Sequence, residues 1–410
     1  MTVVDIGLGL VLALAGVTVI AALVVGDQRR SAVAGTLSAT LGLTAAVTGL
    51  AALAGTTGTL ALGIGLPGQP ALLLAPDRLG GLFLAIVGCV SALAAWFGVG
   101  YARGASATRV SWTAYPVFVL GMVLVPASAD ALGFLLGWEL MAISSTVLLA
   151  ADHATGPRVR SAVLWYAAMT HLSFVLLLAG FAVLATHSGS LSFIAMAAAP
   201  PTGATAAVAF VLLVGGFATK AGLVPVHVWL PRAHPEAPSH VSAVMSAAMV
   251  KMGVYGLLLL VTRLLPEGPA WWGIGLLALG APSALYGILQ ASVTSDLKRL
   301  LAYSTTENVG LIVTAIAVAM LLGGDEQRAV ADVALVAALL LTVSHSAFKT
   351  VLFLSAGAIV HGTGERDLDR LGGLSRTMPV TSAALGVGGL AAAALPISSG
   401  FVAEWVLLQS

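Results

Sequence analysis

Six ionisable side chains lie inside stretches of the sequence that are otherwise apolar, and they are the first candidates for chemistry. They are three lysines and three glutamates: Lys220, Lys251, Lys349, Glu139, Glu307 and Glu404. A charged group at the centre of a bilayer costs about 2.5–3.5 kcal/mol on insertion scales, so such residues mark ion or proton pathways by default. Because the six are spread over several segments, we favour a proton path. Purely structural ion pairs are the alternative.

Two histidines in apolar stretches, His171 and His345, belong with this set. Histidine is the side chain best suited to exchange protons near neutral pH. In the stretch LTVSHSAFKTVLF, His345 precedes Lys349 by four residues, which places both on one face of a helix. A proton could then pass between them directly or through a water molecule.

A helix breaker stands next to the first lysine, in the stretch GGFATKAGLVPVHVWLPRAHPEAPSH. Pro225 has no N–H and clashes with the carbonyl of Ala221, so that carbonyl loses its helical partner. Inside a membrane, broken backbone is tolerated only where it lines water or packs against protein. We therefore predict a helix break at Pro225, with Lys220 beside it at a hydrated position.

The end of the sequence repeats this arrangement in the stretch AAAALPISSGFVAEWVLL. Pro396 and Gly400 interrupt the apolar run, and Glu404 follows. Two broken segments, each carrying one ionisable residue, are typical of transporters built from two inverted repeats. Sequence identity between the two halves is too weak to prove the repeat.

The elements that must position these residues are membrane helices. Of the 410 residues, 59% are hydrophobic and 9% are charged, against about 25% charged in soluble domains. The mean hydropathy is +1.02. Since about 20 apolar residues span a bilayer, we predict an all-α, polytopic bundle of twelve segments. Their approximate spans are 6–26, 32–54, 80–101, 111–127, 130–151, 161–184, 205–230, 240–263, 269–290, 298–322, 329–360 and 377–410.

The basic residues indicate how these segments are oriented. With the N-terminus outside, twelve lysines and arginines fall in inner loops and only Arg78, Arg263 and Arg328 in outer loops, as the positive-inside rule predicts. The connecting loops are short, so we expect a single transmembrane domain over residues 1–410 in the cytoplasmic membrane. The first stretch lacks a basic region and a cleavage site, so it is predicted to be a helix and not a signal peptide.

Several other classes of function find no support in the sequence. The net charge of +1 argues against a nucleic-acid partner, and the single Cys89 excludes an intrachain disulfide. No nucleotide-binding or serine-hydrolase motif occurs. His234, Glu236 and His240 are a minor candidate for a metal site, which the surrounding prolines disfavour. We expect no metal and no cofactor in this chain, and place any redox catalysis in partner subunits.

Several long motifs resemble a known family. They are GWELMAISSTVLL, FATKAGLVPVHVWLPRAHPEAPSHVSAVMSAAMVKMGVYGLL, SDLKRLLAYSTTENVGLI, HSAFKTVLFLSAGAIVHGTGERDLDRLGGL and GFVAEW. These are similar to the proton-conducting antiporter-like membrane subunits of respiratory complex I, Mrp-type cation/proton antiporters and membrane-bound hydrogenases. The sequence around Lys220 is most similar to that of the hydrogenase-4 component B and formate hydrogenlyase branch. The resemblance runs from about Asp77 to the end.

The resemblance implies a family fold of fourteen helices with two inverted five-helix repeats and broken seventh and twelfth helices. On this basis residues 1–104 hold helices one to three. Residues 105–265 form the first repeat, with helices four to eight. Residues 266–410 form a second repeat that stops inside the twelfth helix, which leaves the second half-channel incomplete.

The resemblance also implies roles for single residues. Those that match family positions are Glu139 on the fifth helix, Lys220 on the broken seventh, Lys251 on the eighth, His345 and Lys349 on the eleventh, and Glu404 on the broken twelfth. The family's proposed function for the acids and lysines is a water-linked proton path along the membrane midplane. In this chain Leu341 stands where complex I relatives often have a further histidine.

The function expected from these observations is that of a proton-translocating membrane subunit in a redox-driven complex, of the membrane-bound hydrogenase or complex I-like kind. Its partners would be other membrane subunits, a soluble redox arm and the lipid bilayer. It would move protons, with Na⁺ as a second candidate ion. The alternatives are a subunit of an Mrp-type Na⁺/H⁺ antiporter and a non-conducting membrane scaffold.

Overall fold

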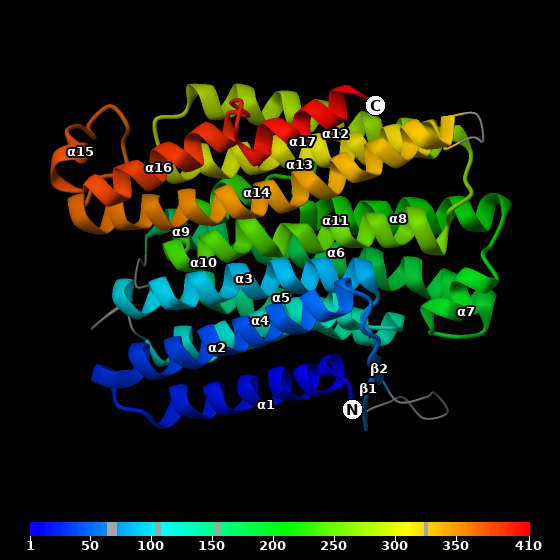
Figure 1. Ribbon diagram of the computed structural model, residues 1–410, viewed down its shortest axis with the longest axis horizontal. Coiled ribbons are helices and arrows are strands. Elements are labelled where there is room, and N and C mark those ends of the chain that lie inside the picture. Colours follow the sequence, from blue (N-terminus) through cyan, green and yellow to red (C-terminus); the bar gives the residue numbers. More distant parts are fainter. Residues whose placement is uncertain (64–71, 103–107, 152–155, 324–326) are drawn as a thin grey trace. The chain divides into compact units, whose positions relative to one another are not determined.

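The computed structural model describes residues 1–63, 72–102, 108–151, 156–323 and 327–410 (Figure 1). Within these ranges, eleven helices are long and apolar enough to cross a membrane. Two shorter apolar helices, α16 (Pro379–Ala392) and α17 (Ser399–Leu408), together cover the last predicted segment. The all-α transmembrane bundle is therefore confirmed, and each of the twelve predicted segments has a counterpart.

The chain divides into two compact units, the first comprising Met1–Phe217 and Tyr255–Pro266. Its helices are α1 (Val3–Val24), α2 (Asp27–Leu53), α3 (Arg78–Tyr101), α4 (Arg109–Ala127), α5 (Ala131–Ala150), α6 (Pro157–Ser188), α7 (Phe193–Ala198), most of α8 (Gly203–Ala221) and the second half of α11 (Val250–Leu259). A short antiparallel hairpin of β1 (Leu60–Leu62) and β2 (Leu72–Leu74), absent from the predicted elements, accompanies them.

Close helix contacts in the first unit depend on small residues. A Cβ atom on Gly49 of α2 would lie 2.6 Å from the carbonyl oxygen of Gly81 on α3, so only glycine permits this backbone approach. Small residues at helix interfaces are the usual means of tight packing in membranes. Elsewhere in the unit the core is aromatic, with the ring centroid of Phe134 5.5 Å from that of Trp138 and 5.3 Å from that of Phe181.

The second unit comprises Ala218–Val254 and Glu267–Ser410. Besides the end of α8 and the first half of α11, it holds α9 (Leu230–Glu236), α10 (Ser239–Val244), α12 (Ala270–Val293), α13 (Leu297–Leu321), α14 (Arg328–Thr363), α15 (Leu374–Thr377), α16 and α17. Helix α13 packs against both α12 and α14, and α14 packs against α16 and α17. Leu301 of α13 and Phe353 of α14 belong to its apolar core.

The first predicted break is present. Helix α8 ends at Ala221, and Gly222 adopts a left-handed conformation with φ of +77°, which glycine accepts without strain. The next helix, α9, begins at Leu230. Protein groups satisfy part of the freed backbone, because the indole of Trp229 donates to the carbonyl oxygen of Thr219 at 2.8 Å. Pro225 lies within this interruption, as predicted.

The second predicted break separates α16 from α17. Ala394 and Ile397, which flank the Leu395–Pro396 pair, have positive φ values of 48° and 75°. The hydroxyl of Ser398 caps α17 by accepting the N–H of Phe401 at 3.1 Å. Both interruptions therefore fall at the prolines that the sequence marks.

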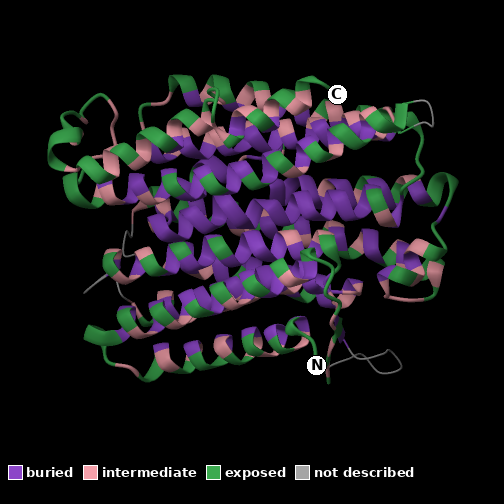
Figure 2. Cartoon of the chain, in the orientation of Figure 1, coloured by how far each residue is buried: buried purple, intermediate pink, exposed green. Residues whose placement is uncertain are grey.

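A π-helical turn over Met245–Met249 separates α10 from α11. The surrounding span, Ser239–Leu264, contains an 18-residue window that is completely buried, and Figure 2 shows it as a nearly unbroken buried run. The hydroxyl of Ser246, within the turn, contacts the hydroxyl of Thr305 on α13 at 2.7 Å. Single π-helical turns inside α-helices frequently occur at functional sites, and Lys251 follows this one closely.

Candidate functional site

The central contact of the second unit joins a lysine and a histidine. The Nζ atom of Lys251 on α11 lies 2.8 Å from Nδ1 of His345 on α14, and both side chains are 0% exposed. The other ring nitrogen of His345 has no hydrogen-bond partner among the described residues. At this distance the two nitrogens can share one proton, which then sits on the amine or on the imidazole.

Lys349 lies one helical turn further along α14 and is also fully buried. Its Nζ atom donates to the carbonyl oxygen of Leu301 at 2.9 Å and makes a very short contact with the hydroxyl of Ser304, both on α13. Within the described residues, neither Lys251 nor Lys349 has a carboxylate oxygen within 4.0 Å. The two lysines are therefore held by neutral groups and not by ion pairs.

Two carboxyl groups of the second unit, Glu307 and Glu404, line one open pocket with a volume of about 560 Å³. The pocket lies among α12, α13, α14, α16 and α17, and Ser304 also lines it. The amine of Lys349 contacts the hydroxyl of Ser304, so Lys349 lies beside this pocket. The structure therefore brings the predicted residues Glu307 and Glu404 to one pocket, next to Lys349.

The first unit contains the remaining predicted pair. The Nε2 atom of His171 on α6 lies 3.0 Å from a carboxylate oxygen of Glu139 on α5, and the other ring nitrogen lies 2.8 Å from the carbonyl oxygen of Ala167. The side chains are 52% and 22% exposed, respectively. This pair is more open than the one formed by Lys251 and His345.

Lys220 occupies the last turn of α8, one residue before the helix ends, and is 1% exposed. It belongs to the second unit together with Pro225, and the structure places it directly at the break as the sequence indicates. Pro396 lies in the break between α16 and α17, as Pro225 lies in the break between α8 and α9.

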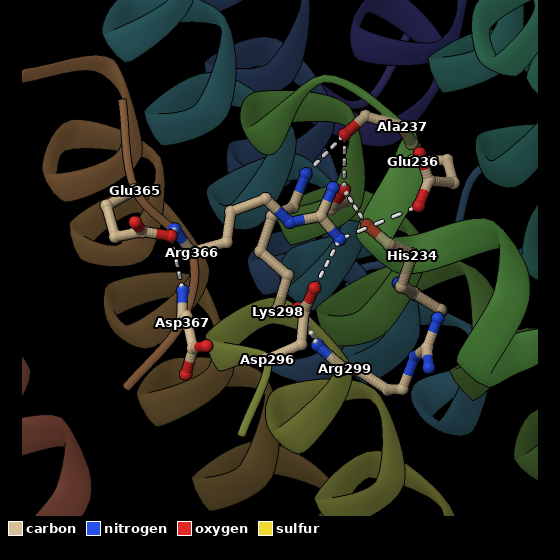
Figure 3. A network of polar contacts seen from close by, with 10 residues as sticks. His234, Glu236, Ala237, Asp296, Lys298, Arg299, Glu365, Arg366 and Asp367 are labelled. Carbon is tan, nitrogen blue, oxygen red and sulfur yellow. Dashed lines mark hydrogen bonds and ion pairs between the residues drawn. The ribbon is translucent and has the colours of Figure 1, made fainter. Parts of the chain in front are cut away.

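A polar network that the sequence does not reveal lies at one end of the second unit (Figure 3). Arg366 forms ion pairs with Asp296 at 2.7 Å and with Glu236 at 3.6 Å. Nearby, the Nζ atom of the buried Lys298 donates to the carbonyl oxygen of Ala237 at 2.5 Å. We call these five residues the Arg366 network. The loop that carries Arg366 follows α14, and the two ion pairs anchor it to α9 and to the N-terminal end of α13.

His234 lies on α9 beside this network and outside the eleven spans. It is 0% exposed. Its ring centroid lies 6.0 Å from that of Trp229, on which it stacks, and 5.6 Å from that of Phe353. Burial lowers the pKa of His234 to about 3, and the charges of Lys298 and Lys349 act in the same direction.

The described residues contain no group of three or more histidine, cysteine, aspartate or glutamate side chains placed to hold a metal ion. Sequence reasoning overlooked the neutral partners of Lys349, namely the hydroxyl of Ser304 and the carbonyl of Leu301. The run of hydroxyl residues before Glu307 was the available signal, because three consecutive polar residues are unusual in an apolar helix.

The fold agrees with the comparisons to known proteins. The model of the NADH:quinone oxidoreductase/Mrp antiporter transmembrane family matches residues 128–410. The chain therefore belongs to this family of multi-pass membrane proteins, and the resemblance stated from the motifs is confirmed.

Among curated relatives, an uncharacterized protein of Mycobacterium tuberculosis is 53% identical over 334 residues, covering 82% of this chain and 52% of that protein. Hydrogenase-4 component B of Escherichia coli is 40% identical over 296 residues, covering 72% of this chain and 44% of its own length. The chain thus spans about half the length of the curated relatives it matches.

Solved structures share the fold at lower identity. The Mrp complex from Dietzia sp. contains a chain with a TM-score of 0.84 and 24% identity, covering 100% of this chain and 74% of that one. An archaeal membrane-bound sulfane sulfur reductase contains a chain that also has a TM-score of 0.84, at 22% identity. The match covers 98% of this chain and 81% of that one. These two likenesses concern the fold alone.

Proposed function

We propose that this chain is a proton-translocating subunit of a redox-driven membrane assembly, of the membrane-bound hydrogenase or complex I-like kind. The similarity to hydrogenase-4 component B and to formate hydrogenlyase subunit 3 of Escherichia coli supports the hydrogenase kind. In this proposal the chain carries no redox centre of its own, and electron transfer takes place in partner subunits.

The observation that carries the proposal is the contact between Lys251 and His345. Burial disfavours a charge on either side chain, and an isolated buried charge is costly unless it is paired and hydrogen-bonded. With no carboxylate within 4.0 Å among the described residues, the pair gains most by holding a single proton between its two nitrogens. A structural ion pair would instead place a carboxylate beside the lysine. The absence of a carboxylate within this distance among the described residues therefore favours proton transfer.

The partners in this proposal are other membrane subunits and a soluble redox arm, with protons as the transported ion and Na⁺ as the second candidate. The protein resides in the cytoplasmic membrane with its N-terminus outside, and the bias of basic residues supports this orientation. Cysteines introduced at Arg158 and Glu267 of a Cys89→Ala chain test it. Labelling of Glu267→Cys from the outside and of Arg158→Cys from the inside is expected, and the reverse pattern contradicts the orientation.

A second candidate function is that of an Mrp-type antiporter component. A Na(+)/H(+) antiporter subunit of Alkalihalophilus pseudofirmus is 40% identical over 202 residues, covering 48% of this chain and 24% of its own length. A non-conducting scaffold is the third candidate, and it predicts that the buried lysines matter only for assembly.

The test of the proposed function is substitution of Lys251 in the native assembly, with proton movement followed in inverted membrane vesicles. Lys251→Ala should lower proton transport per assembled complex by at least about tenfold, a lower bound on the usual proton-transfer contribution of about 10²–10⁴-fold. Lys251→Arg should fail nearly as badly, because a guanidinium group does not release its proton. Arg263→Ala, in the same span but in an exposed ion pair with Asp77, is the control. Normal transport in both Lys251 variants would contradict the proposed function and favour the non-conducting scaffold.

A further inference from the structure

An open groove with a volume of about 370 Å³ lies among α1, α4 and α5, all of which belong to the first unit. Aliphatic side chains form most of its walls, among them Leu23 of α1, Val117 of α4 and Ile143 of α5. Leu23 and Ile143 are 47% and 50% exposed, so the groove opens outward from the helices of this unit. In a membrane, an outward-facing apolar groove is filled by lipid or by the helix of a partner.

The hydroxyl groups in the walls do not make the groove a water path. The hydroxyl of Thr113 donates to the carbonyl oxygen of Arg109 at 2.7 Å, and the hydroxyl of Ser144 donates to that of Leu140 at 2.5 Å. Each hydroxyl therefore directs its proton to the backbone of its own helix, as serine and threonine in helices often do. The walls suit a hydrocarbon chain better than a column of water.

One end of the groove carries a positive charge. Arg109, the first residue of α4, lines the groove and is exposed. Within the described part of the chain, no carboxylate oxygen lies within 4.0 Å of its guanidinium group. A guanidinium group can bind a phosphate through two parallel hydrogen bonds. The N-terminus of α4 adds the positive end of a helix dipole at the same place. An apolar groove with a cationic end matches the chemistry of an anionic phospholipid.

The groove has about the depth of one leaflet. At its charged end, Leu23 lies next to the last residue of α1, and Val147 lies in the last turn of α5. At its other end, Val117 follows Arg109 by two turns of α4, which corresponds to about 12 Å along the helix. The hydrocarbon core of a bilayer is about 30 Å thick, so half of it is about 15 Å. An acyl chain below a headgroup at Arg109 would therefore follow the groove towards the membrane centre.

We infer that this groove binds an anionic phospholipid of the inner leaflet, with the phosphate on Arg109 and one acyl chain against α4 and α5. Only the assignment to the inner leaflet rests on the proposed function, through its orientation of the chain. The cytoplasmic leaflet contains anionic lipids, and basic pockets between membrane helices on that side bind their headgroups. A zwitterionic lipid fits less well, because its ammonium group adds a positive charge near the guanidinium.

The first test locates the lipid by photolabelling. The native assembly is placed in nanodiscs of phosphatidylcholine that contain a phosphatidylglycerol analogue with a diazirine on one acyl chain. We expect labels on Val117, Leu140 and Ile143 in the groove. Excess unlabelled phosphatidylglycerol should compete with this labelling, whereas phosphatidylcholine should not. A phosphatidylcholine analogue with the same acyl chain is the control for random lipid contact and should label these residues weakly.

The second test removes the charge at the end of the groove. Arg109→Gln should lower labelling by the phosphatidylglycerol probe at least about tenfold, because a hydrogen bond to a charged group is lost. The matched control is Arg158→Gln, at the exposed start of α6 and outside the residues that line the groove. It should lower labelling less than about twofold, since its charge acts only through the screened surface potential. Equal losses in the two variants would show general attraction to an anionic surface and would overturn the site.

The third test fills the groove and leaves Arg109 in place. Ile143→Trp should abolish labelling of Val117 by the phosphatidylglycerol probe, because the larger ring occupies the space of the acyl chain. Leu136→Trp is the matched control, since Leu136 is 48% exposed on the same helix and does not line the groove. It should leave the labelling unchanged. If Arg109→Gln fails to assemble, this pair of variants decides the question.

Two further results would overturn the inference. Equal labelling of the groove by both probes would show bulk lipid without selection of the anionic headgroup. Absence of labelling by either probe in the native assembly would show that a helix of a partner subunit covers the groove. Neither result bears on the proposed proton transport, which the Lys251 variants test.

Discussion

The two compact units each hold a histidine in contact with one ionisable partner, but the partners differ in charge and the sites differ in exposure. In the first unit, His171 meets the acid Glu139 at 3.0 Å, and the histidine is 52% exposed. In the second unit, His345 meets the base Lys251 at 2.8 Å, and both are fully buried.

This difference indicates that the two sites handle protons differently. In the first unit, a carboxylate oxygen faces a ring nitrogen, so a proton between them has one acidic and one basic neighbour. A buried lysine with a histidine is stable with one shared proton, because a second charge would be strongly repelled. The pair of Glu139 and His171 is therefore suited to hold a proton, and the pair of Lys251 and His345 is suited to hand one on.

The largest expected effect comes from removing a buried base. Lys349→Met keeps much of the length of the side chain but removes the amine. Proton transport per assembled complex in inverted vesicles should fall by at least about tenfold. Ser304→Ala removes only one acceptor and should lower transport less than Lys349→Met does, by about fivefold, since a typical net hydrogen bond contributes about 1 kcal/mol. Equal effects of the two substitutions would contradict the special role of the amine.

The acid of the exposed pair should matter next. Glu139→Gln retains the shape and loses the charge, so we expect transport to fall about fivefold while assembly is unaffected. Glu139→Asp retains the carboxylate with a shorter reach and should keep partial activity. Transport is measured for both variants against the wild-type assembly. If glutamine, aspartate and glutamate proved equivalent, the charge at this position would have no part in transport.

The exposed histidine should be easier to replace than the buried one. His171→Gln should change transport by no more than about fivefold, because glutamine keeps a donor for the carboxylate of Glu139 and a typical net hydrogen bond contributes about 1 kcal/mol. His345→Gln should cost at least about tenfold, since glutamine cannot share the proton of Lys251. The same assay compares both variants, and a reversed order would refute the link between burial and proton transfer.

The smallest effect is expected in stability alone. Ser246→Ala removes the hydroxyl contact between the π-helical turn and Thr305. Thermal unfolding in detergent should show a loss of about 1 kcal/mol, with transport nearly unchanged. A double-mutant cycle with Thr305→Val isolates the pair, and a coupling energy near zero would show that the two hydroxyls do not support each other.

Much of the fold could be predicted because single residues carry strong signals in a membrane. The apolar runs define the helices, and Pro225 and Pro396 mark both breaks, since proline cannot continue the hydrogen-bond ladder. Lys251 and Lys349 are conspicuous because buried charges are rare. These signals are local, and each one can be recognised without knowledge of what lies opposite.

The partners across helices could not be predicted. The spacing of His345 and Lys349 places them on one face, but only the packing of α14 shows that His345 contacts Lys251 while Lys349 contacts Ser304. The Arg366 network was hidden because charges near helix ends are usually solvated. Similarly, nothing in the composition of a helix reveals that one turn holds an additional residue.

The wide turn accommodates that additional residue without further rotation of the helix that follows it. Each residue of an α-helix turns the chain by about 100°, so if Met245–Met249 were wound as regular α-helix with all its residues kept, every later side chain of α11 would swing by about that angle. Lys251 would then leave the face from which it reaches His345. The direction in which the lysine points thus depends on the winding of the turn before it as well as on its position in the sequence.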